Sequence, residues 1–85
     1  MLTNRDILEI FDKYIPRGKR IPVHEIHNIV ENHYGLSPED WKPNPSEIRR
    51  GNNYPRWKRK VQAALNKLKN KSKIQHIEKD HEYIF

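Results

Sequence analysis

The stretch that decides the fold is Asn53–Lys69, which reads NYPRWKRKVQAALNKLK. Its apolar residues recur every three or four positions, as they do on the buried face of an α-helix. One stripe holds Trp57, Val61, Ala64, Leu65 and Leu68. Pro55 suits the first position of a helix because proline has no N–H to leave unpaired there, so the cap falls on Asn53 or Tyr54. We therefore expect a helix from Pro55 to Lys69 that packs on a core through its tryptophan and leucines.

The other faces of this helix are polar and cationic. Opposite the apolar stripe lie Arg59, Gln62, Ala63 and Asn66, and the margins carry Arg56, Lys58, Lys60, Lys67 and Lys69. Donors and acceptors that point outward between two rows of cations suit the DNA major groove, where base edges lie between phosphates. A solvated basic helix packed on a core has the same pattern, because lysine and arginine are ordinary surface residues.

The positive charge of the chain is concentrated around this helix. The net charge is +6, yet residues 41–73 hold 11 Lys and Arg against one Asp or Glu, while both flanking segments are mildly acidic. If the fold keeps the central segment on one side, it forms a positive patch that attracts polyanions. This asymmetry favours nucleic-acid binding over a generic soluble surface, which mixes the two signs.

Length and composition narrow the class of protein. A chain of 85 residues makes one domain with a small core, and its apolar end, Tyr83-Ile84-Phe85, suggests a piece cut from a longer protein. The absence of cysteine excludes disulfides and thiolate zinc sites. No apolar run approaches the roughly 20 residues of a membrane span, and the N-terminus lacks the order of a signal peptide. We expect a cytoplasmic protein.

Two further helices are expected before the central one. Thr3 and Asp6 resemble a capping box, and they start a helix that Pro16 ends. Its apolar face is expected to hold Ile7, Leu8, Phe11, Tyr14 and Ile15. Lys19-Arg20-Ile21 is a minor edge strand. The second helix runs from Val23 to Tyr34, and Gly35 closes it in the left-handed conformation.

The segments on either side of the central helix are predicted as turns, a loop and a hairpin. Ser37, Pro38 and Asp40 predict one extra helical turn, after which Trp41 packs back on the core. Lys42–Asn52 reads as a loop that carries Arg49 and Arg50 to the central helix. Asn70 is expected to take a left-handed cap after that helix. Two β-prone runs, Ile74–Ile77 and Glu82–Phe85, flank a polar turn and predict a β-hairpin.

Helix, short strand, helix, helix and hairpin is the element order of a winged helix. The sequence therefore predicts an α+β fold, mainly α: a winged helix-turn-helix with three main helices and a C-terminal hairpin as the wing. In that fold the third helix enters the major groove and the wing touches the backbone or the adjacent minor groove.

The chain also resembles the winged-helix module of restriction endonucleases of the Mrr type and related modules beside HNH and modification-dependent nucleases. The resemblance covers about Ile21 to Phe85 and rests on HEIHNIVENHYGLSPED and RWKRKVQAALNKLKNKSKI. The positions that match are Gly35, Leu36, Ser37, Trp57, Arg59 or Lys60 beside Val61, and Leu65, Leu68 and Lys69. The family commonly has Gly after the third helix and in the wing, where this chain has Asn70–Ser72 and Asp80-His81. The resemblance implies a DNA-reading module of a restriction or defence protein, with a modified base among its candidate targets and a nuclease domain fused or associated.

Sites for other chemistry are weakly supported. His24, His27 and Glu31 share a helix face, and His76 and His81 approach each other across the hairpin, but neither set has a third ligand fixed by spacing. No serine has a matching base and acid, and the three glycines make no phosphate loop. We expect no enzymatic activity and no cofactor in these residues.

We therefore expect a domain that binds double-stranded DNA through ten residues. Base edges are assigned to Arg56, Arg59, Gln62 and Asn66, and phosphates to Lys58, Lys60, Lys67, Arg49 and Arg50. Tyr54 is the candidate to touch a phosphate or sugar. The main alternative is a protein-interaction winged helix whose basic face docks an acidic partner. A structural RNA binder is the third possibility.

Overall fold

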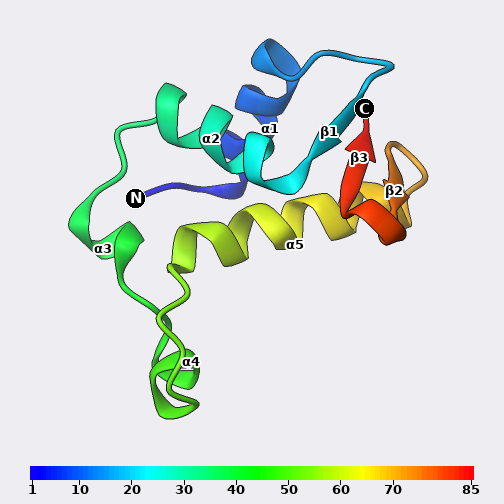
Figure 1. The fold of residues 1–85 in the computed structure, drawn as a ribbon. Coiled ribbons are helices and arrows are strands. Elements are labelled where there is room, and N and C mark those ends of the chain that lie inside the picture. The colour runs from blue at the N-terminus through cyan, green and yellow to red at the C-terminus, as the bar shows by residue number, and fades with distance from the viewer.

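The computed structural model describes all residues from Met1 to Phe85. The fold is α+β and mainly helical, with five α-helices and a three-stranded antiparallel sheet. Figure 1 shows α5 as the long helix along the body, with α1, α2 and the sheet on one side of it. A lobe that carries α4 hangs from the opposite side, at the N-terminal end of α5.

Helix α1 (Asn4–Tyr14) begins where the sequence predicts it. Thr3 Oγ1 accepts a hydrogen bond from the Asp6 backbone N–H at 3.1 Å, and the Asp6 carboxylate accepts one from the Thr3 N–H at 3.0 Å. The predicted apolar face was wrong at two positions, since Leu8 and Tyr14 are 39% and 45% exposed and Ile10 is buried instead. Leu2 turns inward ahead of the cap and is fully buried.

The second helix, α2 (Val23–His33), leads into the single turn of α3 (Pro38–Trp41). The left-handed role predicted for Gly35 is wrong, because Tyr34 leaves the helix in an extended conformation, with φ −136° and ψ 135°. The predicted cap of α3 is confirmed, since Ser37 and Asp40 form a reciprocal capping box. Trp41 packs its ring edge-on to Trp57 at 5.4 Å, yet it is 42% exposed.

The segment predicted as a plain loop contains the short helix α4 (Pro45–Arg49). Proline at its first position, and backbone hydrogen bonds from Glu47 and Ile48 to the Asn44 carbonyl, stabilise this single turn. Because a bridge pairs Pro43 with Pro55, the segment between them leaves and re-enters the body at one place. We call residues 43–55 the arm, and Figure 1 shows it projecting away from the other elements.

Helix α5 (Arg56–Asn70) is the predicted central helix. Trp57, Val61, Ala64 and Leu65 are buried in the core, as the apolar stripe requires. The predicted cap was wrong: Pro55 itself takes the cap position, in an extended conformation, and neither Asn53 nor Tyr54 caps. The left-handed residue after the helix is Ser72, at φ 59°, and not Asn70, which is still helical.

The sheet joins the hairpin to the strand between the first two helices. Its order is β1 (Arg20–Pro22), β3 (Glu82–Ile84), β2 (Gln75–Ile77), with both pairs antiparallel. The hairpin turn is a 3-10 helix, η1 (Glu78–Asp80), closed by His81 in the left-handed conformation at φ 51°. The predicted edge strand and hairpin are therefore confirmed.

A core of 14 buried hydrophobic residues lies between α1, α2, α5 and the sheet. Trp57 and Tyr83 are its largest fully buried side chains. None of the helices has the length and apolar character needed to cross a membrane.

Candidate nucleic-acid interface

The outward face of α5 lies opposite the core. Its exposed residues are Arg59, Ala63, Asn66, Lys67 and Asn70. Figure 1 shows no helix or strand over this face apart from the arm at the N-terminal end. The hairpin packs on the core side of α5, so the face that the sequence predicts for binding is open along most of its length.

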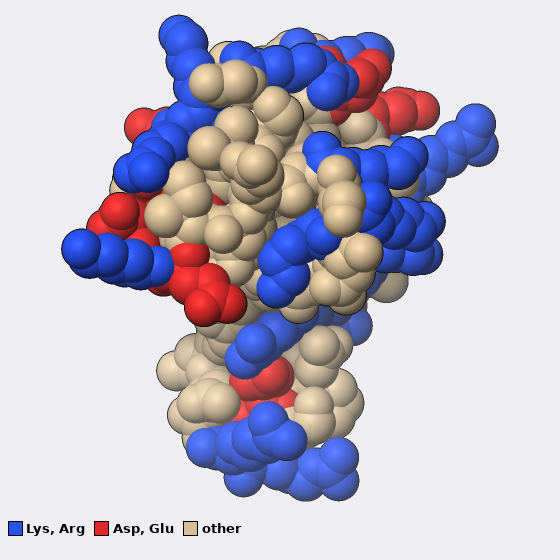
Figure 2. All heavy atoms as spheres, turned by 90° about the vertical axis from the view of Figure 1, so that its right-hand side faces the viewer, with Lys and Arg blue, Asp and Glu red and all other residues tan.

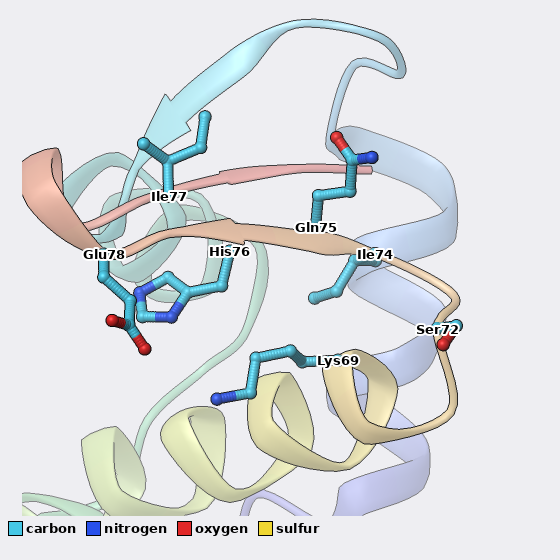
Figure 3. A pocket seen from close by; sticks show the side chains of 7 residues that line it. All are labelled: Lys69, Ser72, Ile74, Gln75, His76, Ile77 and Glu78. Atoms are coloured by element: carbon cyan, nitrogen blue, oxygen red, sulfur yellow. The ribbon is translucent and has the colours of Figure 1, made fainter.

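The hairpin covers one margin of α5. Gln62 is partly buried there, and its Nε2 donates to the Tyr83 hydroxyl at 3.1 Å and to Asn66 Oδ1 at 3.0 Å. A hollow of about 560 Å³ separates the end of this margin from β2. Figure 3 shows Lys69 extending beneath β2 into this hollow, on the side from which His76 and Glu78 hang. Lys69 therefore lies under the sheet edge and not on the outward face.

The other margin of α5 faces α1 and the N-terminus. Lys60 Nζ donates to the Leu2 carbonyl at 2.8 Å, so this predicted phosphate ligand is tied to the N-terminal segment. Lys67 is exposed and has no acidic partner, and it lines a small hollow together with Lys71 and Lys73. Lys71 and Lys73 were not predicted to belong to the site. The alternating lysines of KLKNKSK after Asn66 could have signalled them.

Arg59 joins the arm to α5. Its Nη2 lies 3.0 Å from Glu47 Oε1, and its guanidinium lies over the Tyr54 ring at 4.5 Å. Glu47 is buried although it belongs to an otherwise exposed lobe. A hydrogen bond from Asn52 and the charge of Arg59 hold the pKa of the Glu47 carboxyl below its ordinary value. Arg59 and Tyr54, both predicted DNA contacts, are thus engaged where the arm meets α5.

Arg56 also forms hydrogen bonds at the base of the arm. Its Nε donates to the Lys42 carbonyl at 3.1 Å and its Nη2 to the Pro43 carbonyl at 3.4 Å. By contrast, Arg49 and Arg50 at the end of α4 are exposed and form no ion pair or side-chain hydrogen bond. Lys58 lies near the rings of Tyr54 and Trp57, at 6.0 and 5.6 Å.

The distribution of charge follows these contacts. Figure 2 shows basic side chains grouped over one half of the face and again over the end of the lower lobe. Along the opposite edge, basic and acidic side chains alternate. Five exposed cations form neither an ion pair nor a side-chain hydrogen bond and lie on the arm or along the α1 margin of α5 and just beyond its end: Arg49, Arg50, Lys67, Lys71 and Lys73. The surface can therefore bind a polyanion, but with fewer unengaged cations on α5 than the sequence suggests.

The histidines do not assemble a metal site. His76 Nε2 lies 3.4 Å from His81 Nδ1 across the hairpin turn, as the sequence suggests, but no group of three or more His, Asp or Glu side chains could hold an ion. His27 packs edge-on to Trp57 at 5.6 Å, and burial, assisted by the charge of Lys58, lowers its pKa to about 4. His27 is therefore neutral at pH 7 and packs, partly buried, against the core residue Trp57.

Comparison with known proteins adds no assignment. No family model, curated protein or solved structure matches the chain.

Proposed function

We propose that the chain is a winged-helix module that binds double-stranded DNA with α5 in the major groove. The element order α1-β1-α2-α5-β2-β3 and the strand order β1-β3-β2 support this topology. The additional turns α3 and α4 lie between the second and third helices of that arrangement.

The backbone also supports the resemblance to the modules of Mrr-type restriction endonucleases. That family commonly has Gly after the third helix and in the wing. In this chain the two left-handed non-glycine residues are Ser72 and His81, at these two places. Because left-handed backbone favours glycine, both conformations agree with the family pattern although the residues differ. A role in a restriction or defence protein of the cytoplasm follows from that resemblance alone.

The main support for DNA binding is the open face of α5, which lies between two groups of cations. Lys67, Lys71 and Lys73 lie on its α1 margin, and the arm carries Arg49 and Arg50 away from the body at the other end. A duplex that follows α5 meets cations at both ends of the helix. Contacts of this kind supply affinity that falls as salt increases, because bound cations on the DNA are released.

The test is a titration of a mixed-sequence duplex, read by fluorescence anisotropy at several salt concentrations. Lys67→Ala should weaken binding to all sequences alike and reduce the slope of log K against log salt by about 0.9. Lys13→Ala is the matched control, because Lys13 is an exposed lysine on the side of α1 that faces His33 and Tyr34. Binding that does not depend on salt, or that changes equally in the two variants, contradicts the proposal.

A protein-interaction module is the competing function, and one feature favours it. Leu8 and Leu68 line two adjoining hollows beside Lys73, so an apolar strip borders the α1 margin of cations. NMR shift mapping with a mixed duplex pool separates the two functions. Shifts confined to the arm and the outward face of α5 support DNA binding, whereas silence there supports the docking of an acidic protein.

A further inference from the structure

A groove with an apolar floor lies between α1 and the C-terminal end of α5. Two adjoining hollows form it, one of about 280 Å³ and one of about 150 Å³, and Leu8, Leu68 and Lys73 line both. The other apolar residues that line the groove are Phe11, Ala64, Ile74 and Phe85. We call the two hollows together the α1–α5 groove.

The floor of this groove is part of the folded core. Phe11 and Ile74 are buried, and Phe85 packs edge-on to Phe11 at 5.3 Å. The Phe85 carbonyl accepts a hydrogen bond from the Gly18 N–H at 2.9 Å, which fixes Phe85 beside α1. Leu8, by contrast, remains 39% exposed. Covering the groove would therefore remove apolar surface from water without requiring the floor to form first.

Exposed cations surround the floor. Lys67 and Lys71 line the smaller hollow, Arg17 lines the larger one, and Lys73 lines both. The three lysines form neither an ion pair nor a side-chain hydrogen bond. Asp12 is the one acidic residue that lines the groove, and it is already paired with Arg17 at 2.9 Å. A ligand that fills the groove must therefore bring negative charge beside its apolar groups, because the lysines lose water when they are covered.

The shape of the groove favours a polypeptide over other anionic ligands. A duplex would meet the lysines with its phosphates, but it has no apolar side chain to place in the hollows. Binding to a bilayer requires apolar side chains that project into it, whereas those of the groove line hollows. The smaller hollow, of about 150 Å³, has the size of an apolar cavity that accepts benzene. One apolar side chain of a polypeptide can therefore fill it.

The surroundings of the groove favour a helical ligand. None of the residues that line it belongs to a strand, so no strand edge offers backbone hydrogen bonds to an extended peptide. A helix satisfies its own backbone and places the side chains of residues i and i+4 about 5–6 Å apart on one face. Two such side chains can enter the two adjoining hollows, while acidic residues on their flanks meet the lysines.

We propose that the α1–α5 groove docks an acidic amphipathic helix of a partner protein. Leu8 and Leu68 contact its two apolar anchors, and the three lysines contact its carboxylates. The proposal goes beyond DNA binding and does not depend on it, because the groove lies on the α1 side of α5 and not on the outward face. The lysines are shared with the proposed phosphate contacts, so the docked helix should also weaken duplex binding.

The probe is a fluorescein-labelled, alanine-based helical peptide with phenylalanine and leucine at positions i and i+4 and glutamates on both flanks of this pair. Its binding to the protein is read by fluorescence anisotropy in the absence of DNA. A second peptide of the same composition places the phenylalanine and leucine on opposite faces, and it tests whether charge alone suffices. The wild-type protein should bind the first peptide about 10-fold more tightly than the second.

Two pairs of variants separate the floor from the rim. Leu8→Gln should weaken the first peptide about 10-fold and leave the salt dependence of binding unchanged, because it removes an apolar contact and no charge. Tyr14→Gln is its matched control, since Tyr14 is an exposed side chain of the same helix outside the groove. Lys73→Ala should weaken the peptide and also reduce the salt dependence. Lys13→Ala, at an exposed lysine outside the groove, should do neither.

Several results overturn the proposal. Equal affinity for the two peptides, or equal effects of Leu8→Gln and Tyr14→Gln, would show that the lysines act only as a charged surface. Absence of peptide binding overturns it directly. Binding to phosphatidylserine vesicles in place of the peptide, or self-association that Leu8→Gln abolishes, would assign the groove to another occupant. Absence of salt-dependent duplex binding, by contrast, refutes the proposed DNA function and leaves the peptide result standing.

Discussion

Lowering the pH from neutral to about 5 should destabilise the fold through His27, before any carboxylate contributes. His27 lies against Trp57, the residue that anchors the start of α5 to the core. Burial lowers its pKa from 6.5 to about 4, and the nearby charge of Lys58 adds to the effect. The unfolded chain therefore takes up a proton near pH 6.5, while the folded protein resists it until about pH 4. Because the unfolded state binds more protons, stability falls across this interval as the pH decreases.

The magnitude follows from the same two values. A difference between 6.5 and about 4 corresponds to about 3 kcal/mol at full effect. His27 is only partly buried, and solvent screening reduces its charge interactions, so we expect about 1–2 kcal/mol in total. About 1 kcal/mol of this should be lost between about pH 7 and pH 5. Asp6, Glu39, Asp40 and Glu47 all have lowered pKa values, so they add their own losses only in more acidic solution.

The assay is urea denaturation followed by tryptophan fluorescence at a series of pH values. His27→Gln should flatten the dependence of the free energy of unfolding between about pH 7 and pH 5, since glutamine does not titrate. His24→Gln, which removes an exposed histidine of the same helix, should leave the dependence as in the wild type. A His27→Gln protein whose unfolding free energy keeps the wild-type pH dependence would refute the reasoning.

Two further predictions concern the Asp40 cap of α3 and the ion pair between Arg59 and Glu47. Asp40→Ala removes a fully buried carboxylate that caps α3, and it should lower the free energy of unfolding in urea by about 2–3 kcal/mol. The control Asp12→Ala breaks an exposed ion pair and should change that free energy by less than about 1 kcal/mol. Equal changes in the two variants would count against the buried cap. Arg59→Ala and Glu47→Ala should each speed amide hydrogen exchange in residues 45–52, while exchange in the buried part of α5 stays slow. Unchanged exchange in residues 45–52 would show that the Arg59–Glu47 ion pair does not hold the arm against α5.

The starts of α1 and α3 could be predicted because their signals are local. Thr3 with Asp6 and Ser37 with Asp40 need only three residues of spacing to close a capping box, and both boxes form. The helix ends were predicted less well. Gly35 and Asn70 are able to take left-handed backbone, but whether a residue does so depends on where the next element must go, and the sequence alone does not fix that direction.

The candidate site shows the same division between local and distant signals. The apolar stripe of α5 and its basic margins follow from helical period, and the buried stripe is confirmed. The partners of the charged residues could not be predicted, because they lie far away in sequence: Leu2 for Lys60, Lys42 for Arg56 and Glu47 for Arg59. The segment that supplies two of these partners, Lys42–Asn52, was itself predicted as a loop.

These partners change which of the proposed residues are free to contact DNA. Since Arg56, Arg59 and Lys60 hold the arm and the N-terminus, using any of them for DNA would mean breaking a contact that the fold already makes. Affinity then depends mainly on five exposed cations that form neither an ion pair nor a side-chain hydrogen bond: Arg49, Arg50, Lys67, Lys71 and Lys73. If all five meet phosphates, the slope of log K against log salt is about −4.5, and a slope near −7 would require about three further cations, so at least one of the three engaged cations would have to join Lys58 and Lys69. Sequence preference falls to the amides of Gln62 and Asn66, which carry no charge and so add nothing to that slope. Salt dependence and base preference should therefore respond to separate sets of substitutions on one helix.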